Sequence, residues 1–258
     1  THKNIISNVQ GTLGKVDINE TDTLLSFLPL SHSFERMGGH FLAFSVGATV
    51  YYAESIETVP ANLVETTPTV VLSVPRLYEK MYAKVLDNVK SAPKIRQNIF
   101  WWAQSIGEQI KLIRSSGAKI SPCMNFKLKI ADKLVFSKLK AKVGGKLRFF
   151  VSGGAPLSKD IGEFFDSAGV IILEGYGLTE TSPVLTCNTV NERKFGTVGK
   201  VLDNVQVKIA KDGEILAKGD NIMKGYFKND KATKEVVDSD GWFYSGDIGE
   251  FDEEGYLK

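Results

Sequence analysis

Residues 149–180 read FFVSGGAPLSKDIGEFFDSAGVIILEGYGLTE, and this stretch decides the fold class. A strand pattern over 146–151 and an all-apolar one over 170–173 each lead into a glycine-rich segment. Between them, apolar residues recur at helical spacing, with Ser158 as the expected N-cap and Gly169 as the expected stop. In an open α/β sheet, ligands bind beyond the carboxyl ends of the strands. The stretch therefore predicts a strand-helix-strand unit with a binding site at two glycine-rich turns.

The sequence upstream of this unit alternates between strand and helix patterns. The expected strands cover 23–28, 48–52 and 69–73, and the expected helices cover 4–13, 34–46 and 57–65. Such alternation favours a parallel sheet with helical crossovers. From 76 to 143 no strand pattern occurs, which indicates two or three helices broken near Pro93, Ser116 and Pro122.

Downstream of about residue 195 the pattern becomes that of antiparallel strands. Residues 205–209 alternate between apolar and polar side chains, 211–213 (Lys-Asp-Gly) form a hairpin turn, and 214–217 form the returning strand.

The predicted fold class is α/β, with parallel sheets and flanking helices followed by a C-terminal antiparallel β-barrel-like subdomain. We expect the α/β portion to cover 1–195 and the β-rich subdomain to cover 196–258. Within the first portion, 76–145 is expected to be mainly helical and basic.

The composition excludes several classes of protein. The chain has 258 residues, of which 43% are hydrophobic and 24% charged, so it is neither disordered nor collagen-like. Nowhere do about 18 consecutive apolar residues occur, and the first residues lack the basic-then-apolar order of a signal peptide. Cys123 and Cys187 are far apart and lack the spacing of a metal site. We expect two structural thiols and a cytoplasmic location.

The net charge of +2 conceals a basic central block. Residues 76–148 contain 17 Lys and Arg but 4 Asp and Glu, which leaves 15 basic and 26 acidic residues elsewhere. The basic side chains alternate with apolar ones at helical spacing, as they do on solvated helix faces. A second interpretation is peripheral contact with an anionic membrane surface through this block and its Trp101-Trp102 pair. No aromatic-basic strand motif accompanies the block, so we expect no nucleic acid partner.

The second glycine-rich segment carries side chains suited to a nucleotide. Tyr176, between Gly175 and Gly177, offers an aromatic face to a base, and Thr179 offers a hydroxyl to a phosphate. Glu180 offers the hard oxygen ligands that Mg²⁺ prefers. Glycines also serve close packing alone, so these residues by themselves leave a purely structural interpretation open.

Five segments share a resemblance to one family. They are PLSHSFER at 29–36, SVPRLY at 73–78, GYGLTETSP at 175–183, GEI at 213–215 with GY at 225–226, and WFYSGDIG at 242–249. The third resembles the signature of the adenylate-forming superfamily of acyl-CoA synthetases, peptide-synthetase adenylation domains and luciferases. The first two resemble stretches of its long-chain fatty acyl-CoA synthetase branch, and the last two resemble its β-barrel strand motif and its ribose-binding motif. Five motifs in the family's order indicate membership rather than chance.

The resemblance implies how the nucleoside of ATP is held. Gly153, Gly154 and Ala155 would line one side of adenine with their backbone, and Tyr176 would pack on the base. Asp247 would accept hydrogen bonds from both ribose hydroxyls, which suits a carboxylate because it offers acceptors only.

The resemblance also implies the residues near the reacting groups. Gly175 and Gly177 belong to the nucleotide-binding signature, Thr179 would meet the α-phosphate, and Glu180 would bind Mg²⁺. His32 would lie near the carboxylate of the acid and later near the thiol of CoA.

The implied reaction joins a long-chain fatty acid to CoA in two steps. The carboxylate attacks the α-phosphate of ATP to give acyl-AMP and pyrophosphate, and CoA then displaces AMP. In the family, a phosphate loop precedes the position of Thr1, and a hinge and C-terminal domain follow that of Lys258. We therefore expect this chain to be a central portion that does not turn over alone.

The fatty tail requires an apolar tunnel. Phe34, Met37, Phe41, Phe44 and Val46 recur near helical spacing after His32 and are the candidates to line it. The same spacing also predicts that these residues simply pack their helix against the sheet.

Two other functions stay open at this point. The enzyme could adenylate a different acid, such as an aryl, amino or short acyl acid; for an ammonium group the nearby acid is Glu35, which Arg36 is expected to pair. A non-catalytic nucleotide- or acyl-binding module is the other alternative, and such a module is expected to have lost Thr179, Glu180 or Asp247. The sequence also leaves the oligomeric state open, a homo-oligomer included.

Overall fold

The computed structural model describes residues 1–258, the side chain of Ser115 excepted, and within them seven strands form one sheet in the order β2-β1-β3-β4-β5-β6-β7. The strands are β1 (Thr23–Ser26), β2 (Thr49–Tyr52), β3 (Val70–Ser73), β4 (Phe149–Ser152), β5 (Ile172–Gly177), β6 (Val184–Cys187) and β7 (Lys200–Val201). Strands β1 to β5 pair in parallel, and β6 and β7 continue the sheet antiparallel. The predicted α/β class with a largely parallel sheet is confirmed.

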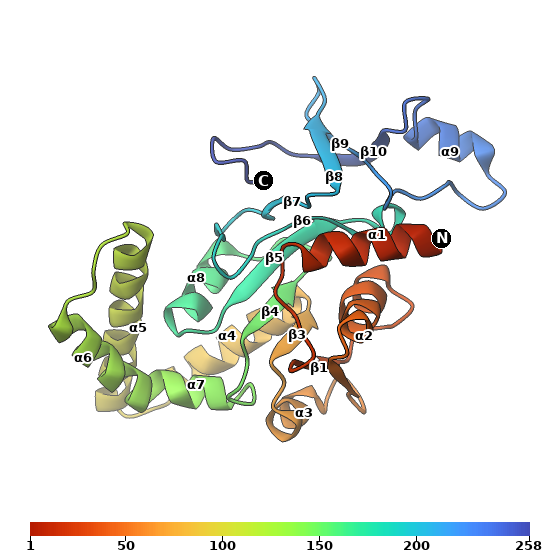
Figure 1. Ribbon diagram of the computed structural model, residues 1–258. Coiled ribbons are helices and arrows are strands. Elements are labelled where there is room, and N and C mark those ends of the chain that lie inside the picture. The colour runs from red at the N-terminus through yellow and green to blue at the C-terminus, as the bar shows by residue number, and fades with distance from the viewer.

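Helices cover both faces of this sheet (Figure 1). One face carries α1 (His2–Leu13), the π-helix η1 (Glu35–Phe41) and α2 (Leu42–Ser45); the other carries α3 (Val59–Thr66), the start of α4 (Pro75–Lys90) and α8 (Lys159–Ser167). Each face has its own apolar core because successive strand residues point to opposite sides. Val70 belongs to the core under η1, whereas its neighbour Val71 belongs to the core under α4 and α8.

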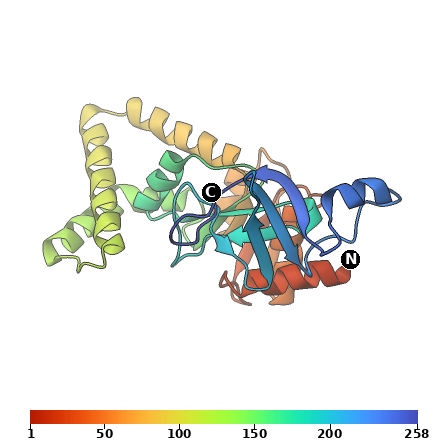
Figure 2. The same cartoon turned by 90° about the horizontal axis from the view of Figure 1, so that it is seen from above.

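The helices α4 to α7 project from the body as an arm (Figures 1 and 2). After α4, the arm consists of α5 (Lys94–Ser115), α6 (Pro122–Ala131), the π-helical segment η2 (Asp132–Phe136) and α7 (Ser137–Ala141). The expected breaks are confirmed, because Pro93 and Ser116 bound α5 and Pro122 starts α6. Within the described residues, no helix has both the length and the apolarity needed to cross a membrane.

A smaller antiparallel sheet follows the large one. Its strands are β8 (Val205–Ile209), β9 (Glu214–Gly219) and β10 (Phe243–Ile248), in the order β10-β9-β8, with α9 (Asp230–Val236) before β10. The predicted β8–β9 hairpin is confirmed, and Gly213 provides the positive φ of 92° that its turn requires. Figure 1 shows this sheet beside β6 and β7, so residues near residue 245 lie above the large sheet.

The second glycine-rich segment is not a turn, which corrects the sequence analysis. Residues 174–177 belong to β5, where β6 pairs with them and places Cys187 opposite Gly175. This pairing keeps the backbone extended beyond the all-apolar run, and the chain turns only at a short 3₁₀ segment, Thr179–Thr181. Antiparallel pairing therefore begins at β6, earlier than the expected change near residue 195.

Helix α8 begins and ends where the sequence predicted. Ser158 is the N-cap residue, and Gly169, with a φ of 74°, follows the last turn. Among the described residues, however, the Ser158 side chain accepts no capping hydrogen bond.

Close packing explains Gly38, the first of the two glycines in η1. A Cβ atom added to Gly38 would lie 2.5 Å from the Cδ2 atom of Leu72 on β3. The glycine therefore lets the widened helix lie directly on the sheet, in the place where an ordinary helix was expected over 34–46. This approach brings the residues just before η1 to the carboxyl ends of β3, β4 and β5.

Candidate active site

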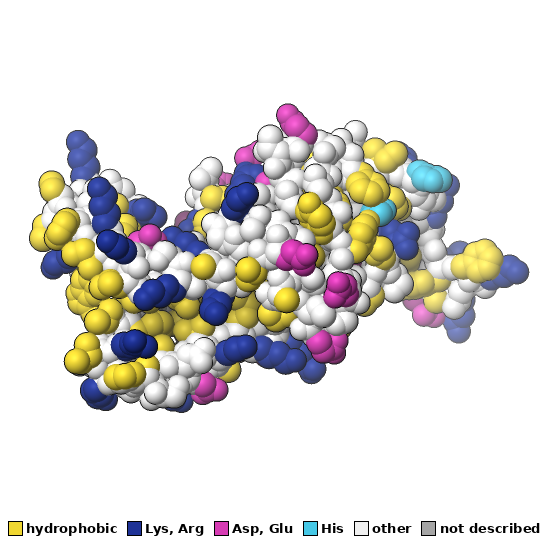
Figure 3. Space-filling model, turned by 90° about the horizontal axis from the view of Figure 1, so that it is seen from below, with side chains coloured by type: hydrophobic (Ala, Val, Ile, Leu, Met, Phe, Trp, Pro, Cys, Tyr) yellow, Lys and Arg dark blue, Asp and Glu magenta, His cyan; other side chains and the backbone are white. Residues whose placement is uncertain are grey.

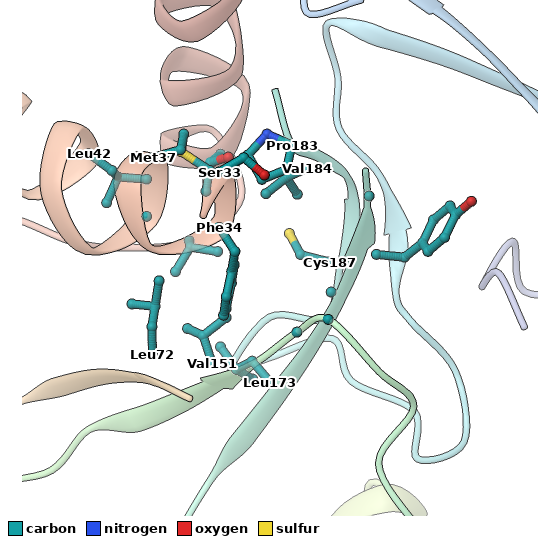
Figure 4. Close-up of a pocket in the computed structure, with 18 of the residues that line it drawn as sticks. Ser33, Phe34, Met37, Leu42, Leu72, Val151, Leu173, Pro183, Val184 and Cys187 are labelled. Atoms are coloured by element: carbon teal, nitrogen blue, oxygen red, sulfur yellow. The ribbon is translucent and has the colours of Figure 1, made fainter. Parts of the chain in front are cut away.

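A cavity of about 220 Å³ lies at the carboxyl ends of the central strands, between the sheet and η1 (Figure 4). Its wall is largely apolar, with Phe34, Met37 and Leu42 from the η1 side facing Leu72, Val151 and Leu173 from the strands. Its rim is polar and glycine-rich, because the segment before η1 and the end of β5 meet there. One opening thus joins an apolar interior to a polar surface.

The cavity brings together most of the residues singled out in the sequence. Its lining includes His32, Gly153, Gly154, Gly175, Tyr176, Gly177 and Thr179. Ala155, Glu180 and Asp247 are not part of the lining. Ala155 is exposed in the same loop as Gly154, and Glu180 directly follows Thr179 at the rim.

Tyr176 and Asp247 come from different sheets and meet beside the cavity. The Tyr176 hydroxyl donates a hydrogen bond to Asp247 Oδ2 at 2.7 Å, across 71 positions of sequence. Burial, reinforced by the neighbouring Asp247 carboxylate, raises the pKa of Tyr176. The phenol therefore stays a donor at neutral pH, and Asp247, which is exposed, keeps its other oxygen open toward solvent.

The loop that carries Thr179 is tied to both neighbouring segments. The Thr179 hydroxyl lies 3.3 Å from the hydroxyl of Ser33, next to His32. The Glu180 backbone oxygen accepts from the Met223 amide at 2.8 Å, and the Thr181 oxygen accepts from the Asn221 side chain at 2.8 Å. The hydroxyl at position 179 is thus held at a fixed place on the rim.

A buried carboxylate positions the first glycine-rich loop. The Glu174 carboxylate accepts a hydrogen bond from the Leu157 amide at 3.3 Å, which ties the 153–157 loop to β5. Burial raises the pKa of Glu174 to about 7, and the hydrogen bond from Leu157 opposes this shift. Glu174 was not among the residues expected at the site; its place directly before Gly175, on an otherwise apolar strand, was the available signal.

The hydrogen bonds of His32 fix the orientation of its ring. The Phe34 amide donates to His32 Nδ1 at 3.2 Å, so Nδ1 acts as an acceptor and leaves the proton on Nε2. The His32 amide donates to the Pro29 oxygen at 2.9 Å. The side chain is exposed at the cavity rim, where it can meet the head of a ligand whose tail lies inside.

Glu180 suits Mg²⁺ as a single carboxylate ligand. Its Oε1 atom accepts from the Tyr226 hydroxyl at 2.9 Å, and Oε2 has no partner among the described residues. In the part of the chain that the structure describes, no three His, Cys, Asp or Glu side chains come together so that they could hold a metal ion. Mg²⁺ commonly binds one or two carboxylates together with substrate phosphates and water, so the residues present fit it. Tyr226 belongs to a motif quoted above, but the sequence analysis gave it no role.

The apolar residues expected to line a tunnel divide into two groups. Phe34 and Met37 line the cavity, whereas Phe41, Phe44 and Val46 do not. Phe44 is 57% exposed and stacks near the His40 ring, with 4.3 Å between ring centroids. The residues divide in this way because only one face of η1 and α2 is turned toward the strands.

Glu35 does not pair with Arg36, which corrects the sequence analysis. Arg36 Nε donates to the Leu30 oxygen at 2.6 Å, whereas Glu35 points into the core and accepts from the Ser26 hydroxyl. Its second oxygen, Oε2, is buried without a partner among the described residues. Burial raises the pKa of Glu35 to about 7, and the Ser26 hydrogen bond opposes this shift. Adjacent helix positions point about 100° apart, which separates the two side chains.

When the pH is raised from 5 to 8, the free energy of unfolding of the Glu35→Gln variant is expected to fall less than that of the original chain. A carboxyl whose pKa rises from 4.5 to about 7 on folding is protonated in the folded state and ionised in the unfolded state between these values. The free energy of unfolding therefore falls as pH rises from about 4.5 to about 7 and levels off above, by on the order of 3 kcal/mol for this group. Urea unfolding at both pH values measures it, with the exposed Glu235→Gln as the control. Equal pH dependence in Glu35→Gln and the original chain would contradict the assignment.

The chain matches known proteins along its length. The family model described as AMP-binding enzyme matches residues 1–227. The long-chain-fatty-acid–CoA ligase FadD15 of Mycobacterium bovis is 37% identical over 267 residues, which cover 100% of this chain and 42% of that protein. The peroxisomal long chain acyl-CoA synthetase 6 of Arabidopsis thaliana is 35% identical and covers 100% of this chain and 38% of its own length. This chain thus spans less than half the length of these curated relatives.

A solved structure shares the fold. The ATP-bound crystal structure of MatB from Rhodopseudomonas palustris superposes with a TM-score of 0.70 at 24% identity, over 100% of this chain and 43% of that one. The family model covers well over half of the chain, and the resemblance of the five motifs agrees with it. The chain belongs to the family of AMP-binding, adenylate-forming enzymes.

Proposed function

We propose that the whole protein activates a long-chain fatty acid with ATP and transfers the acyl group to CoA. The observation that carries this proposal is the cavity, which has an apolar interior and opens at Thr179, His32 and the glycine-rich loops. A tail in the interior would place a carboxylate at the rim, where the proposed nucleotide site begins. The relatives named as long-chain fatty acid ligases support the choice of acid.

The nucleoside would be held between the two sheets. The Gly153-Gly154 backbone lines one wall, and a base packed on Tyr176 would place the ribose toward Asp247, which the Tyr176 hydroxyl already contacts. Asp247 would accept from both ribose hydroxyls. Ala155 and Gly175 would contribute backbone only, and Gly177 lets the chain pass close to Pro183.

In the first step, a carboxylate oxygen attacks the α-phosphorus, the bond to the leaving oxygen breaks, and pyrophosphate departs. The Thr179 hydroxyl donates to the α-phosphate, and Ser33 beside it orients that hydroxyl. Mg²⁺ bound at Glu180 would neutralise phosphate charge. The apolar cavity would contribute by positioning the acid, because the two reactants must meet in line.

In the second step, the CoA thiol loses its proton to solvent, its sulfur attacks the acyl carbonyl carbon to form the thioester bond, and the bond between that carbon and the AMP oxygen breaks. His32 lies at the rim where this carbonyl would stand, and its Nε2–H is free to donate to the carbonyl oxygen as negative charge develops. AMP then leaves as a phosphate monoester dianion, with its negative charge on the terminal phosphate oxygens.

An amino acid is disfavoured as the acid. Glu35 lies outside the cavity in the core, and Glu174, the acidic residue among the described lining, is bonded to the Leu157 amide. An ammonium group in the cavity described would therefore meet Glu174 alone, whose Oε2 is already bonded and whose pKa burial raises to about 7, so its negative charge is incomplete at neutral pH. Retention of Thr179, Glu180 and Asp247 at one rim likewise argues against a non-catalytic module.

The arm keeps its proposed contact with an anionic membrane surface. Figure 3 shows Lys and Arg side chains spread over the arm, with apolar side chains exposed between them. Ile95, Trp101 and Phe126 are 74%, 51% and 65% exposed.

The proposed division between an α/β portion and a β-rich subdomain falls in the loop between β6 and β7. The oligomeric state and the compartment remain predictions.

The test is ATP–pyrophosphate exchange by the whole protein with saturated fatty acids of increasing length. Exchange is expected to rise with chain length, and Val184→Phe, which places a larger side chain in the cavity, should shift the preference to shorter acids. Discrimination between adjacent acids should change by roughly tenfold. Val201→Phe, on the next strand but outside the cavity, is the control. Exchange with amino acids instead of fatty acids would overturn the choice of substrate.

A further inference from the structure

A second cavity, of about 930 Å³, lies where the arm joins the body. Its walls come from the second half of α5, the end of α6, the η2 segment, Lys140 of α7, the last residues of α8 and the loop 190–195. Gly169 and Ile171, at the amino end of β5, line it, whereas the candidate active site lies at the carboxyl end of that strand. The two cavities share no described lining residue, so the second one is a separate place on the molecule.

Direct contact between α5 and α8 forms one edge of this cleft. A Cβ atom added to Gly107 would lie 2.1 Å from the Ser167 backbone oxygen, so glycine is required for the two helices to touch. One turn earlier, Gln104 Nε2 donates to the Phe164 oxygen at 3.1 Å. The cleft begins at this contact and continues along α5 toward Arg114, with η2 as its other side.

The floor of the cleft is apolar. Ile110, Phe136 and Ala168 are buried and line it, and Phe195 lies at its edge. An apolar ligand group placed against this floor would leave water, which contributes about 25 cal/mol per Å² of apolar surface buried. A space of this size with an apolar floor and a few polar groups is typical of small-molecule sites.

The rim of the cleft is strongly cationic. Five basic side chains line it, namely Lys111, Arg114, Lys129, Lys140 and Arg193, against the two acids Asp132 and Asp166. Both acids are already paired, Asp132 with Lys140 at 2.8 Å and Asp166 with Arg193 at 2.7 Å.

Two of these cations are left without an acidic partner. Lys111 pairs with Glu163 outside the cleft at 2.9 Å, and its ammonium also lies 4.2 Å from the centroid of the Phe195 ring. No described acidic side chain pairs with Arg114 or Lys129. Positive charges that converge on one cleft raise the local potential, and a bound anion would lower it.

We propose that this cleft binds an anionic amphiphile, with its charged head at Arg114 and Lys129 and its tail against Ile110 and Phe136. A nucleic acid fits less well, because its backbone charges need an extended row of cations rather than an apolar floor. The site goes beyond the proposed reaction, since none of its residues belongs to the candidate active site. The head can be a carboxylate or a phosphate monoester, and the experiment separates these two sources.

The experiment measures binding of laurate and of dodecyl phosphate to the full chain by calorimetry, below their micelle-forming concentrations. Inorganic phosphate tests the head alone, and dodecanol tests the tail alone. The variant Arg114→Gln/Lys129→Gln removes the two unpaired charges. Lys127→Gln/Lys133→Gln removes the same charge from neighbouring exposed positions outside the cleft. Circular dichroism of each variant confirms that it folds.

We expect Arg114→Gln/Lys129→Gln to weaken binding of the favoured amphiphile roughly tenfold to a hundredfold, since each lost contact is a hydrogen bond to a charged group. The control pair should stay within about twofold of the original chain. Equal affinity in the two double variants would overturn the proposal. Inorganic phosphate binding as tightly as dodecyl phosphate would exclude a role for the floor, and dodecanol binding as tightly as laurate would exclude a role for the cations. If Val184→Phe abolishes binding and Arg114→Gln/Lys129→Gln does not, the amphiphile binds in the first cavity, and the proposal is overturned.

Discussion

Replacement of Asp247 by alanine is expected to lower ATP–pyrophosphate exchange by the whole protein by roughly 10²–10⁴-fold. Two ribose hydroxyls would lose a charged acceptor, and hydrogen bonds to charged groups are each worth about 1.5–3 kcal/mol. The loss should appear mainly in kcat/KM for ATP. Asp240→Ala, an exposed aspartate in the turn before β10, is the matched control and should leave exchange unchanged.

The sugar itself provides a second test of Asp247. The original protein should prefer ATP over 2′-deoxy-ATP, and the Asp247→Ala variant should lose most of that preference, since the acceptor for the 2′-hydroxyl is gone. Tyr176→Phe keeps the carboxylate and removes its 2.7 Å partner, so a smaller rise in the KM for ATP is expected. Preserved discrimination in Asp247→Ala would place the ribose elsewhere.

Gly177→Ala is expected to reduce the free energy of unfolding by about 3–5 kcal/mol. A Cβ atom at this position would lie 1.8 Å from the Pro183 backbone oxygen and 2.6 Å from its carbonyl carbon. Backbone cannot yield as a flexible side chain can, so the end of β5 must separate from β6. Because Thr179 lies two residues further along the chain, the same change should also abolish adenylation.

The matched control for this change is Gly14→Ala, at the C-cap of α1. Gly14 has a φ of −66°, and an added Cβ would lie no closer than 3.4 Å to its neighbours, so alanine fits there. That variant should be neutral or slightly stabilising, because it restricts the unfolded chain. Urea unfolding of both variants measures the difference. A Gly177→Ala midpoint equal to that of Gly14→Ala would refute the packing argument.

Local sequence patterns predicted those elements whose determinants are local. The apolar spacing of α8 and Gly169 after it marked that helix, and Pro93 marked the break before α5. The end of β5 was not predictable in this way. Its extended form depends on pairing with β6, and glycines that accompany such pairing look the same in sequence as glycines in a turn.

The contacts of the candidate site were the least predictable part. The resemblance to a family named Asp247 and Tyr176, but only folding shows that they touch each other across two sheets. The environment of Glu35 was mistaken because sequence neighbours on a helix do not share a direction. The basic block 76–148 was visible in the sequence, but its convergence on one cleft was not, since the charges of the cleft come from α5, α6, η2, α7, α8 and a loop after β6.

The contact between Tyr176 and Asp247 has a consequence for how this site changes during evolution. Tyr176 belongs to the large sheet and Asp247 to the small one, so the base and the sugar of the proposed nucleotide are recognised by separately hydrogen-bonded frameworks. A substitution in β10 alters what is held at the sugar without changing the register of β5. The hydrogen bond between Tyr176 and Asp247 still couples the two sheets, so substitutions at these two positions are expected to affect ATP binding non-additively during evolution.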